Sequence, residues 1–446
     1  MALSQIRLTG EKQKKQLARE EVARQSYNPR LKINRFHSLI ALMPEIPLSQ
    51  IDRKVKHREN LSFEEAFVGM CYIIAATNRC FLSTINSEFK MGLSETRALA
   101  MGVAFAQLMA TKESLAQLTA EEIAGFAAAA MIDIVTEVDF GQAVIEMGGM
   151  GGDRGFVVDG VRKKTINLST LSSFVLAGAK LPVVKHGSYS NTSAVGSTEA
   201  IEFFGAQTNQ ETSSELVEVF KNSGFCFIDA HWCKTVHDLS HLLMMETINH
   251  VVGPMTAPIN YSLPLTKIMG VNEKVYPGSV AQAYTILHNR RIVNLHAACI
   301  VTGLDRVVDP MDREAVREAA ILDELSPVCS VVSAAIGSGF IGTCLVKPED
   351  FGIEIDPGAI VQSNTAEAIH LSNIQALKGQ NKQLADYLAM NAALAYFTHV
   401  YRRLPDTTSR HLLKECFVVC REAISNGSVW RTMSHYVEAT NGTLAV

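Results

Sequence analysis

The sequence predicts an α/β protein: a helical domain packed on an α/β domain with a largely parallel central sheet. Two observations support this prediction. Between about residues 62 and 134 the chain carries helix-start signals and Ala- and Met-rich apolar stretches, without a strand pattern. Further on, short apolar runs alternate with glycine turns and helical stretches, which is typical of a parallel sheet whose strands are joined by helices. We place a basic extension at 1–35, a helical domain at 36–140 and an α/β domain at 141–446.

The helical domain is predicted from the residues that begin its helices. Ser62-Phe-Glu-Glu and Thr119-Ala-Glu-Glu are capping boxes, in which the hydroxyl and the second glutamate satisfy N–H groups at the helix start. Ser94 is a further N-cap candidate before an Ala-rich stretch. We expect helices around residues 235–252 to complete this domain.

The α/β domain is predicted from short apolar runs that are bounded by glycine turns or by helical stretches. The final part of the chain, from about residue 363 to 440, has helical spacing again. The runs expected to form strands are 143–147, 181–185, 225–229, 297–301, 330–334 and 343–346.

Charge and cysteine content exclude several classes of protein. The chain has 446 residues, with 41 Lys and Arg against 45 Asp and Glu. This balance rules out a protein that binds nucleic acid through a broad basic surface. The basic residues 1–35 are either a solvated helix or a local nucleic-acid- or membrane-surface arm. None of the nine cysteines forms a C-x-x-C pair, which argues against a disulfide framework or zinc ribbon. With no apolar run of about 18 residues and no signal core, we expect a cytoplasmic protein.

A glycine-rich loop follows the first expected strand. Residues 148–155 read Gly-Gly-Met-Gly-Gly-Asp-Arg-Gly, and so many glycines let backbone N–H groups approach an anion closely. The loop is neither a Walker A motif nor G-x-G-x-x-G. By itself it therefore indicates either a phosphate site or a tight turn.

Two further segments favour a phosphate ligand. Asn167, Ser169 and Thr170 begin a helix, where hydroxyls and the helix dipole attract anions, although an ordinary helix cap has the same pattern. Lys185 ends a strand and leads into the hydroxyl-rich loop 186–193, and the carboxyl ends of strands are where α/β proteins bind ligands. Two such phosphate-binding segments indicate a ligand with two separated phosphate groups.

In this order, the motifs G-x-G-G-D, N-x-S-T and K-H-G resemble those of anthranilate phosphoribosyltransferases, which share a superfamily with the pyrimidine nucleoside phosphorylases. The segments 247–258, 267–271 and 391–395 resemble later motifs of that family, so the resemblance covers roughly residues 60–440. It implies a fold of the nucleoside phosphorylase/phosphoribosyltransferase type. It also implies a homodimer that binds phosphoribosyl pyrophosphate between its two domains, assisted by Mg²⁺.

The resemblance also implies roles for single residues. On the acceptor side, His231 and Glu246 would be catalytic, although a satisfied loop histidine and an exposed helix glutamate are the alternatives. Ser169 and Asp305 would bind the metal ion. The residues assigned to the phosphoribosyl pyrophosphate site are Gly149, Gly151, Gly152, Asp153, Asn167, Ser169, Thr170, Lys185, His186, Gly187, Ser188 and Ser193.

The chain departs from the family at three places. Ser188-Tyr189 replaces Asn-Arg after K-H-G, and Glu246 replaces the arginine that grips the anthranilate carboxylate. Because Glu246 would repel a carboxylate, we predict an acceptor that offers an amine, an amidine or a ring N–H instead. The family's Asp-Glu metal pair is assigned to Asp305-Arg306, which puts one metal site in doubt and leaves Arg306 to neutralise phosphate charge.

An insertion follows the glycine loop. Asp159-Gly160 lies between Val-rich runs, which predicts a β-hairpin. Its basic residues Arg162, Lys163 and Lys164 either close over the phosphates of the ligand or lie in solvent.

These features predict an enzyme that transfers a phosphoribosyl group to a non-anthranilate, nitrogenous aromatic acceptor and releases pyrophosphate. Positive charge develops on the sugar as the bond at C1 breaks. Positioning and electrostatics supply the rate, so no nucleophilic side chain is expected. Two alternatives stay open: a nucleoside phosphorylase that uses inorganic phosphate, and a non-catalytic homologue that binds a ligand or nucleic acid.

Overall fold

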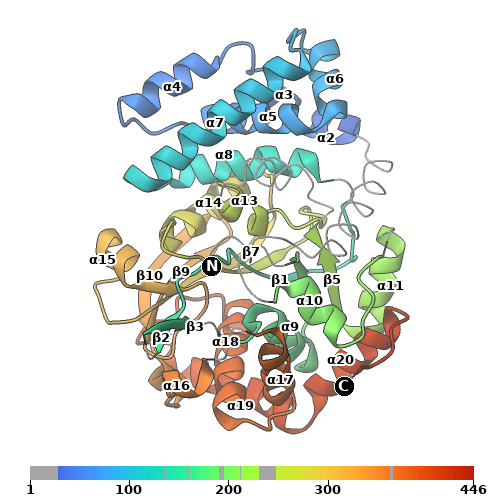
Figure 1. Cartoon of the computed structure of the whole chain (residues 1–446), viewed down its shortest axis with the longest axis vertical. Coiled ribbons are helices and arrows are strands. Elements are labelled where there is room, and N and C mark those ends of the chain that lie inside the picture. The colour runs from blue at the N-terminus through green and yellow to red at the C-terminus, as the bar shows by residue number, and fades with distance from the viewer. Residues whose placement is uncertain are drawn as a thin grey trace.

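The computed structural model has a layer of helices above an α/β layer (Figure 1). It describes residues 29–134, 137–158, 160–163, 165–189, 195–210, 212–230, 248–361 and 365–445. The helices of the upper layer are α2 Pro29–Arg35, α3 His37–Ile40, α4 Leu48–Lys56, α5 Phe63–Thr77, α6 Arg79–Glu88, α7 Glu95–Ala116 and α8 Ala120–Ala130, followed by the short 3-10 helix η1 Met131–Asp133.

The predicted helix starts in this layer are confirmed. Ser62 and Glu65 form a capping box at α5, and Thr119 and Glu122 form one at α8. Ser94 accepts a hydrogen bond from an N–H group in the first turn of α7. These bonds satisfy N–H groups that have no partner inside the helix, so the local sequence by itself sets where each helix begins.

The α/β layer is built on one mixed sheet. Its strand order is β10-β9-β7-β6-β1-β4-β5, with β8 beside β7, and the pairs among β7, β6, β1, β4 and β5 are parallel. The bounds are β1 Val144–Gly149, β4 Val183–Gly187, β5 Phe225–Asp229, β6 Leu265–Gly270, β7 Leu295–Leu304, β8 Ala320–Leu322, β9 Cys329–Ile336 and β10 Gly339–Val346. The predicted fold class and the six predicted strands are confirmed.

The antiparallel strands at one edge modify the predicted parallel sheet. Only Gly337 and Ser338 separate β9 from β10, and Gly337 has a positive φ of 51°. A two-residue connection can join only antiparallel neighbours. Strand β8, which the apolar pattern did not indicate, pairs antiparallel with β7 and so turns the chain back along the sheet.

Helices cover both faces of the sheet (Figure 1). Val144 of β1 enters a core shared with α8, α13 and α14, whereas its neighbour Ile145 enters the opposite core with α9, α18, α19 and α20. The helices of this part are α9 Leu168–Gly178, α10 Ser197–Phe203, α11 Ser213–Ser223, α13 Asn249–Met255, α14 Pro277–Asn289, α15 Arg313–Ala319, α16 Pro357–Ile360, α17 Ala366–Leu377, α18 Lys382–Tyr401, α19 Arg410–Ser425 and α20 Ser428–Ala439, with the 3-10 helix η3 Pro348–Phe351.

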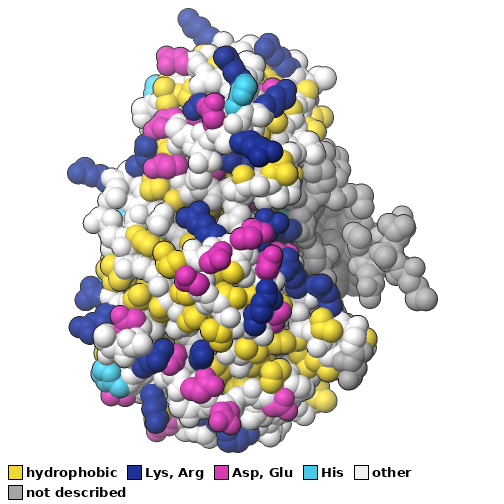
Figure 2. Space-filling view, turned by 90° about the vertical axis from the view of Figure 1, so that its left-hand side faces the viewer, with side chains coloured by type: hydrophobic (Ala, Val, Ile, Leu, Met, Phe, Trp, Pro, Cys, Tyr) yellow, Lys and Arg dark blue, Asp and Glu magenta, His cyan; other side chains and the backbone are white. Residues whose placement is uncertain are grey.

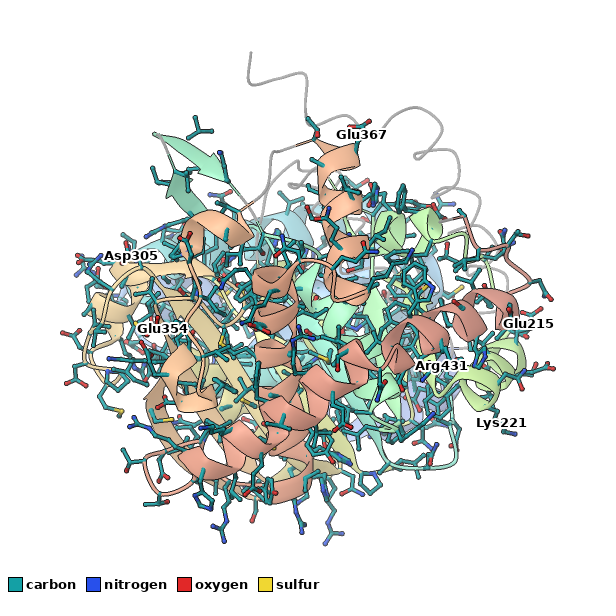
Figure 3. The ribbon with its side chains drawn as sticks, turned by 90° about the horizontal axis from the view of Figure 1, so that it is seen from below. Glu215, Lys221, Asp305, Glu354, Glu367 and Arg431 are labelled. Atoms are coloured by element: carbon teal, nitrogen blue, oxygen red, sulfur yellow. The ribbon has the colours of Figure 1, made fainter. Side chains whose placement is uncertain are left out.

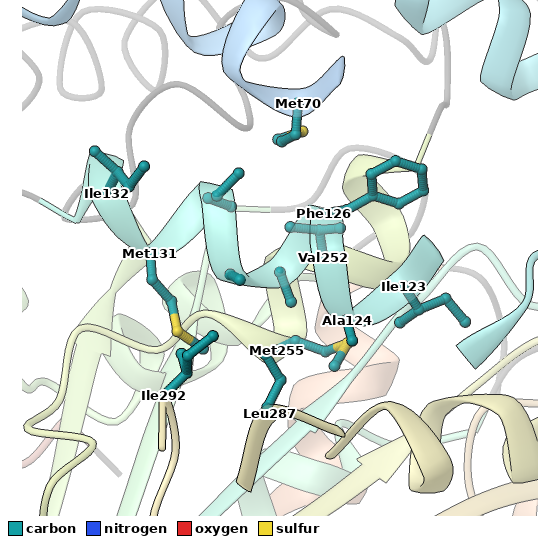
Figure 4. Packing of buried hydrophobic residues seen from close by; sticks show 14 of the residues in the cluster. Met70, Ile123, Ala124, Phe126, Met131, Ile132, Val252, Met255, Leu287 and Ile292 are labelled. Atoms are coloured by element: carbon teal, nitrogen blue, oxygen red, sulfur yellow. The ribbon is translucent and has the colours of Figure 1, made fainter. Parts of the chain in front are cut away.

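The helical layer and the upper face of the sheet share one hydrophobic core. Figure 4 shows Met131 beside Ile292, and Ala124 of α8 beside Met255 of α13. Burying apolar surface from both layers in one core stabilises their mutual arrangement. The boundary between domains at residue 140 remains a prediction, and most of the expected helical segment 235–252 lies outside the described residues.

The predicted hairpin is present as β2 Phe156–Val158 and β3 Val161–Lys163. Gly160 has the positive φ of 75° that its turn requires. Asp159 and Lys164 lie outside the described residues. On the face shown in Figure 2, acidic and basic side chains are interspersed rather than gathered into a basic patch. In the part of the chain that the structure describes, no single helix is long and apolar enough to span a membrane; α5 and α6 pass that test only as a pair bent by 119°.

Candidate functional site

The glycine loop is held from two sides by residues far away in the sequence. The N–H of Gly151 donates to Asp323 Oδ2 at 2.7 Å, and Asn272 Nδ2 donates to the carbonyl of Gly151 at 2.8 Å. Gly151 and Gly152 both have a φ of 65°, a conformation that costs a residue with a side chain about 1–2 kcal/mol. These two hydrogen bonds therefore hold the loop in place from both sides.

The segment around β8 packs against this loop. Gly155 N–H donates to Ile321 O at 2.8 Å. A Cβ atom at Gly270, the last residue of β6, would lie 1.4 Å from the carbonyl oxygen of Asp323. Glycine is therefore required at the end of β6 so that Asp323 can approach the loop.

Asp323 and Glu324 form an acidic pair beside the loop. Burial raises the pKa of Glu324 well above its usual value, and the nearby charges of Asp323 and Asp153 raise it further. Thr165 Oγ1 and Tyr387 OH donate hydrogen bonds to its Oε1 atom, the second at 3.0 Å. Such a carboxyl group at neutral pH holds either a proton or a cation.

This acidic pair fits a divalent cation that arrives with a phosphate ligand. Mg²⁺ prefers oxygen ligands and often takes only one or two carboxylates, completing its shell with phosphate oxygens and water. Among the described residues, no group of three or more His, Cys, Asp or Glu could hold a metal ion alone. Asp323 and Glu324 can therefore supply part of a Mg²⁺ site, and phosphate oxygens would supply the rest.

Asp305, the residue expected to bind the metal ion, lies in a different setting from this pair. Asp305 is 46% exposed, accepts from Arg306 Nη1 at 3.1 Å, and lies at the rim of the molecule in Figure 3. The chain leaves the sheet there, because β7 ends just before Asp305, whereas Asp323 bonds the glycine loop directly. The Asp-Glu pair that was assigned to 305–306 occurs later in the chain, at 323–324.

The first turn of α9 lies at the same edge of the sheet. Asn167 precedes α9 but does not cap it, because its side chain is bonded to Asn373 and to the carbonyl of Val195. Thr170 Oγ1 donates to Ser197 Oγ at 3.2 Å, which ties α9 to the start of α10. Among the described residues, the N–H groups of Ser169 and Thr170 have no acceptor and remain available to an anion.

Lys185 and His186, at the end of β4, have different roles. Lys185 is 3% exposed, and within the described part of the chain its Nζ bonds only the carbonyls of Met147 and His186, at 3.4 and 3.3 Å. Burial lowers the pKa of Lys185 to about 8, although Glu146 and Asp323 act in the opposite direction. Lys185 is therefore a buried cation for which an anionic ligand would be a strong partner.

His186 belongs to a buried charge network that the sequence did not indicate. Its Nδ1 contacts Glu146 Oε1 at 3.0 Å, its Nε2 contacts Gly253 O at 2.9 Å, and Lys267 Nζ bonds the other oxygen of Glu146. Burial would raise the pKa of Glu146, but Lys267 and His186 outweigh it and lower the pKa to about 2. Both ring nitrogens of His186 thus lie at hydrogen-bond distance from oxygen acceptors.

This network fastens α13 to the sheet. Lys267 Nζ also donates to Pro254 O at 2.5 Å, next to the carbonyl that His186 holds. The ring of His186 thus anchors α13, while the chain beside it continues into Gly187 and Ser188. Polar residues inside apolar strands were the available sequence signal for the network, but their pairing depends on three strands that are separate in sequence.

Three of the expected site residues cannot be placed. His231, Glu246 and Ser193 lie outside the described residues. Ser188 Oγ donates to Tyr189 O at 3.0 Å, and Tyr189 OH donates to Glu202 Oε1 at 2.7 Å, so Tyr189 faces α10. The expected roles of the acceptor-side residues remain predictions.

Known proteins resemble this chain in sequence and in fold. Residues 158–305 match the model of the glycosyl transferase family, a/b domain. Anthranilate phosphoribosyltransferase of Bordetella pertussis is 27% identical over 349 residues, which is 77% of this chain and 87% of that protein. The same enzyme of Schizosaccharomyces pombe is 28% identical over 299 residues, 66% of this chain and 73% of that protein.

Solved structures agree on the fold. Anthranilate phosphoribosyltransferase from Thermus thermophilus has a TM-score of 0.62 at 23% identity, covering 87% of this chain and 99% of that chain. The Saccharomyces cerevisiae enzyme in complex with phosphoribosyl pyrophosphate and Mg has a TM-score of 0.59 at 18% identity, covering 92% and 98%. At these identities the structures establish a shared fold.

The matched segment and the fold define a class: residues 158–305 are similar to the α/β domain of the glycosyl transferase family, and the chain shares the fold of the solved structures. Within this class the chain is anthranilate phosphoribosyltransferase-like, and it is a distant homologue of those enzymes at 27% identity. The resemblance drawn from the G-x-G-G-D, N-x-S-T and K-H-G motifs is confirmed.

Proposed function

We propose that the chain transfers the phosphoribosyl group of phosphoribosyl pyrophosphate to a nitrogenous aromatic acceptor other than anthranilate, and releases pyrophosphate. The observation that carries this proposal is the grouping of three elements at one edge of the sheet. These are the pinned glycine loop, the open first turn of α9 and the buried Lys185. Strands β1 and β4 are parallel neighbours, so their carboxyl ends bring the elements together.

Each element suits one part of a doubly phosphorylated sugar. Backbone N–H groups of the glycine loop and of α9 bind phosphate oxygens without the entropy cost of ordering side chains. Lys185 adds a positive charge in a buried setting, where an ionic bond is stronger than in water. Asp323, Glu324 and the hydroxyl of Ser169 would hold Mg²⁺, which neutralises charge on the leaving pyrophosphate.

The chain needs no side-chain nucleophile for this reaction. When the bond between C1 and pyrophosphate breaks, positive charge grows on the ribose, and an acceptor nitrogen held in line completes the transfer. The protein holds donor and acceptor in one geometry and stabilises the leaving group. These requirements match a site made of backbone N–H groups, one lysine and two carboxylates.

The choice of acceptor rests on the sequence. In the resemblance drawn from the sequence motifs, Glu246 takes the position of the arginine that grips the anthranilate carboxylate, and a glutamate there would oppose a second carboxylate. Ser188-Tyr189 replaces the family's Asn-Arg, which removes another cation. An acceptor with an amine, an amidine or a ring N–H suits this side of the site.

Calorimetry with phosphoribosyl pyrophosphate, with and without Mg²⁺, tests the donor half of the proposal. Wild type and the control Lys221→Ala, an exposed lysine on α11, are expected to bind alike. Lys185→Met, which keeps the side-chain volume, is expected to bind at least about tenfold more weakly, because hydrogen bonds to charged groups contribute about 1.5–3 kcal/mol.

Other outcomes would replace the proposal. Binding of inorganic phosphate or a nucleoside, without phosphoribosyl pyrophosphate, would identify a nucleoside phosphorylase. No binding of any of the three would favour a non-catalytic homologue. If the donor binds, turnover with aromatic amines but not with anthranilate tests the acceptor half.

A further inference from the structure

Asn373 of α17 pairs with Asn167 through two hydrogen bonds, although 206 positions separate them. Asn373 Nδ2 donates to Asn167 Oδ1 at 2.9 Å, and Asn373 Oδ1 accepts from the backbone N–H of Asn167 at 3.2 Å. Asn373 is fully buried. Asn167 Nδ2 donates in turn to Val195 O at 3.0 Å, so protein groups engage the side chain of Asn167 at both of its ends.

This pairing changes what Asn167 does at the start of α9. Among the residues that the structure describes, two other asparagines are N-cap residues, and both cap their helices: Asn78 Oδ1 accepts from Phe81 N–H at 3.0 Å, and Asn381 Oδ1 accepts from Leu384 N–H at 3.2 Å. Asn167 makes no such bond. Its oxygen is turned to Asn373 instead of to the N–H of Thr170, three residues on.

The backbone conformation of Asn167 also differs from that of the two asparagines that cap their helices. Its ψ is 64°, whereas Asn78 and Asn381 have the extended ψ values of 99° and 113°. Among the described residues, nothing accepts from the N–H groups of Ser169 and Thr170. A residue type that ordinarily closes a helix start therefore leaves this one open, at the place where the proposed donor phosphates bind.

We propose that Asn373 is a positioning residue of the donor site: it holds the side chain of Asn167 away from α9, so that the N–H groups of Ser169 and Thr170 stay free for a phosphate group. This inference rests on the proposed function. Without Asn373, Asn167 Oδ1 would be free to turn to Thr170 N–H and form an ordinary cap. A phosphate would then have to displace an internal acceptor before it could bind.

The test measures binding of phosphoribosyl pyrophosphate with Mg²⁺ by calorimetry. Asn373→Ala is expected to weaken binding about tenfold, which corresponds to about 1.4 kcal/mol. Ser372→Ala is the matched control, because its hydroxyl lies on the same helix and donates to Ala368 O at 2.9 Å. Thermal melting confirms that each variant is folded at the temperature of the titration, and Asn373→Ser replaces Asn373→Ala if the latter does not fold.

A second substitution separates positioning from general support of the fold. Asn167→Gly removes the competing oxygen, and glycine is tolerated at a helix start. The proposal expects Asn373→Ala/Asn167→Gly to bind more tightly than Asn373→Ala and as well as Asn167→Gly. If Asn373 only supported the fold, the two losses would add, and the double variant would bind no more tightly than Asn373→Ala.

The outcomes also separate the two proposals. A wild-type chain that does not bind phosphoribosyl pyrophosphate would overturn the proposed function, and this inference with it. A wild type that binds, together with an unaffected Asn373→Ala or a double variant without recovery, would overturn the inference alone.

Discussion

The carboxylate of Asp323 accepts a hydrogen bond of 2.7 Å from the backbone N–H of Gly151, across 172 positions of sequence. One acidic residue thereby holds the glycine loop in its left-handed conformation and stands beside the buried Glu324. A phosphate ligand at the loop and a cation at the acidic pair would therefore meet at the same side chain.

Replacing Asp323 by asparagine separates its charge from its hydrogen bond. The amide oxygen of Asp323→Asn can still accept from Gly151 N–H, so the fold is expected to persist. The cation site loses one negative ligand, so the increase in affinity for phosphoribosyl pyrophosphate that Mg²⁺ produces should fall at least about tenfold in calorimetry. Asp305→Asn is the control, since Asp305 is exposed and pairs with Arg306. A stronger effect at Asp305 would return the metal site to that residue.

Gly151→Ala tests the shape of the loop. The added Cβ has nothing within 4 Å, so the substitution acts through the positive φ of 65°, at a cost of about 1–2 kcal/mol. Gly160→Ala at the hairpin tip is matched, with a φ of 75° and equally open space. Urea unfolding should show similar destabilisation in both variants, whereas calorimetry should show weaker donor binding only for Gly151→Ala. Equal donor affinities would mean that the loop does not contact the ligand.

The lowered pKa of Lys185 predicts that binding of the donor depends on pH. The pKa of Lys185 is about 8 in the folded chain, below its ordinary value of 10.5, because the ammonium is buried. Its positive charge is present below that pKa and is lost as the pH rises through it. Donor affinity should therefore fall between about pH 7 and 9.5, by up to tenfold per unit. The affinity of Lys185→Met should be lower and flat over this range, and a parallel decline in both proteins would contradict the assignment.

Lys267→Met tests the charge network under α13. The substitution leaves the ionised Glu146 buried with the ring of His186 as its remaining contact of this network, and breaking a buried ion pair costs about 3–5 kcal/mol. Urea unfolding should show a loss of this size. Lys382→Ala is the control: Lys382 also pairs with a carboxylate, Asp386, but is 77% exposed, and its removal should cost less than about 1 kcal/mol. Similar losses of unfolding free energy in the two variants would show that the buried ion pair stabilises the fold no more than the exposed one.

Local sequence determined much of this protein. The capping boxes at Ser62 and Thr119 begin helices because donor and acceptor lie three residues apart. The glycine loop and the hairpin at Gly160 follow from glycine's access to positive φ. The alternation of apolar runs and helical stretches was sufficient to predict a mostly parallel sheet, since parallel neighbouring strands are usually joined by helical crossovers. The order of the three phosphate-site motifs was sufficient to find the resemblance to anthranilate phosphoribosyltransferases.

Tertiary structure alone decided which acidic residues meet the loop. Asp305 and Asp323 each follow a strand, and although only Asp323 is followed by a glutamate, this local signal does not show which of them meets the loop. Strand β8 pairs antiparallel with β7 and returns the chain, which places Asp323 against Gly151. Tertiary structure also decided the partner of Asn167. Asn373, from a distant part of the chain, donates to the side-chain oxygen of Asn167 that would otherwise cap α9. Residue types and spacing determine interactions that close within a few positions. Contacts between distant segments depend on strand order and packing, which no local pattern encodes.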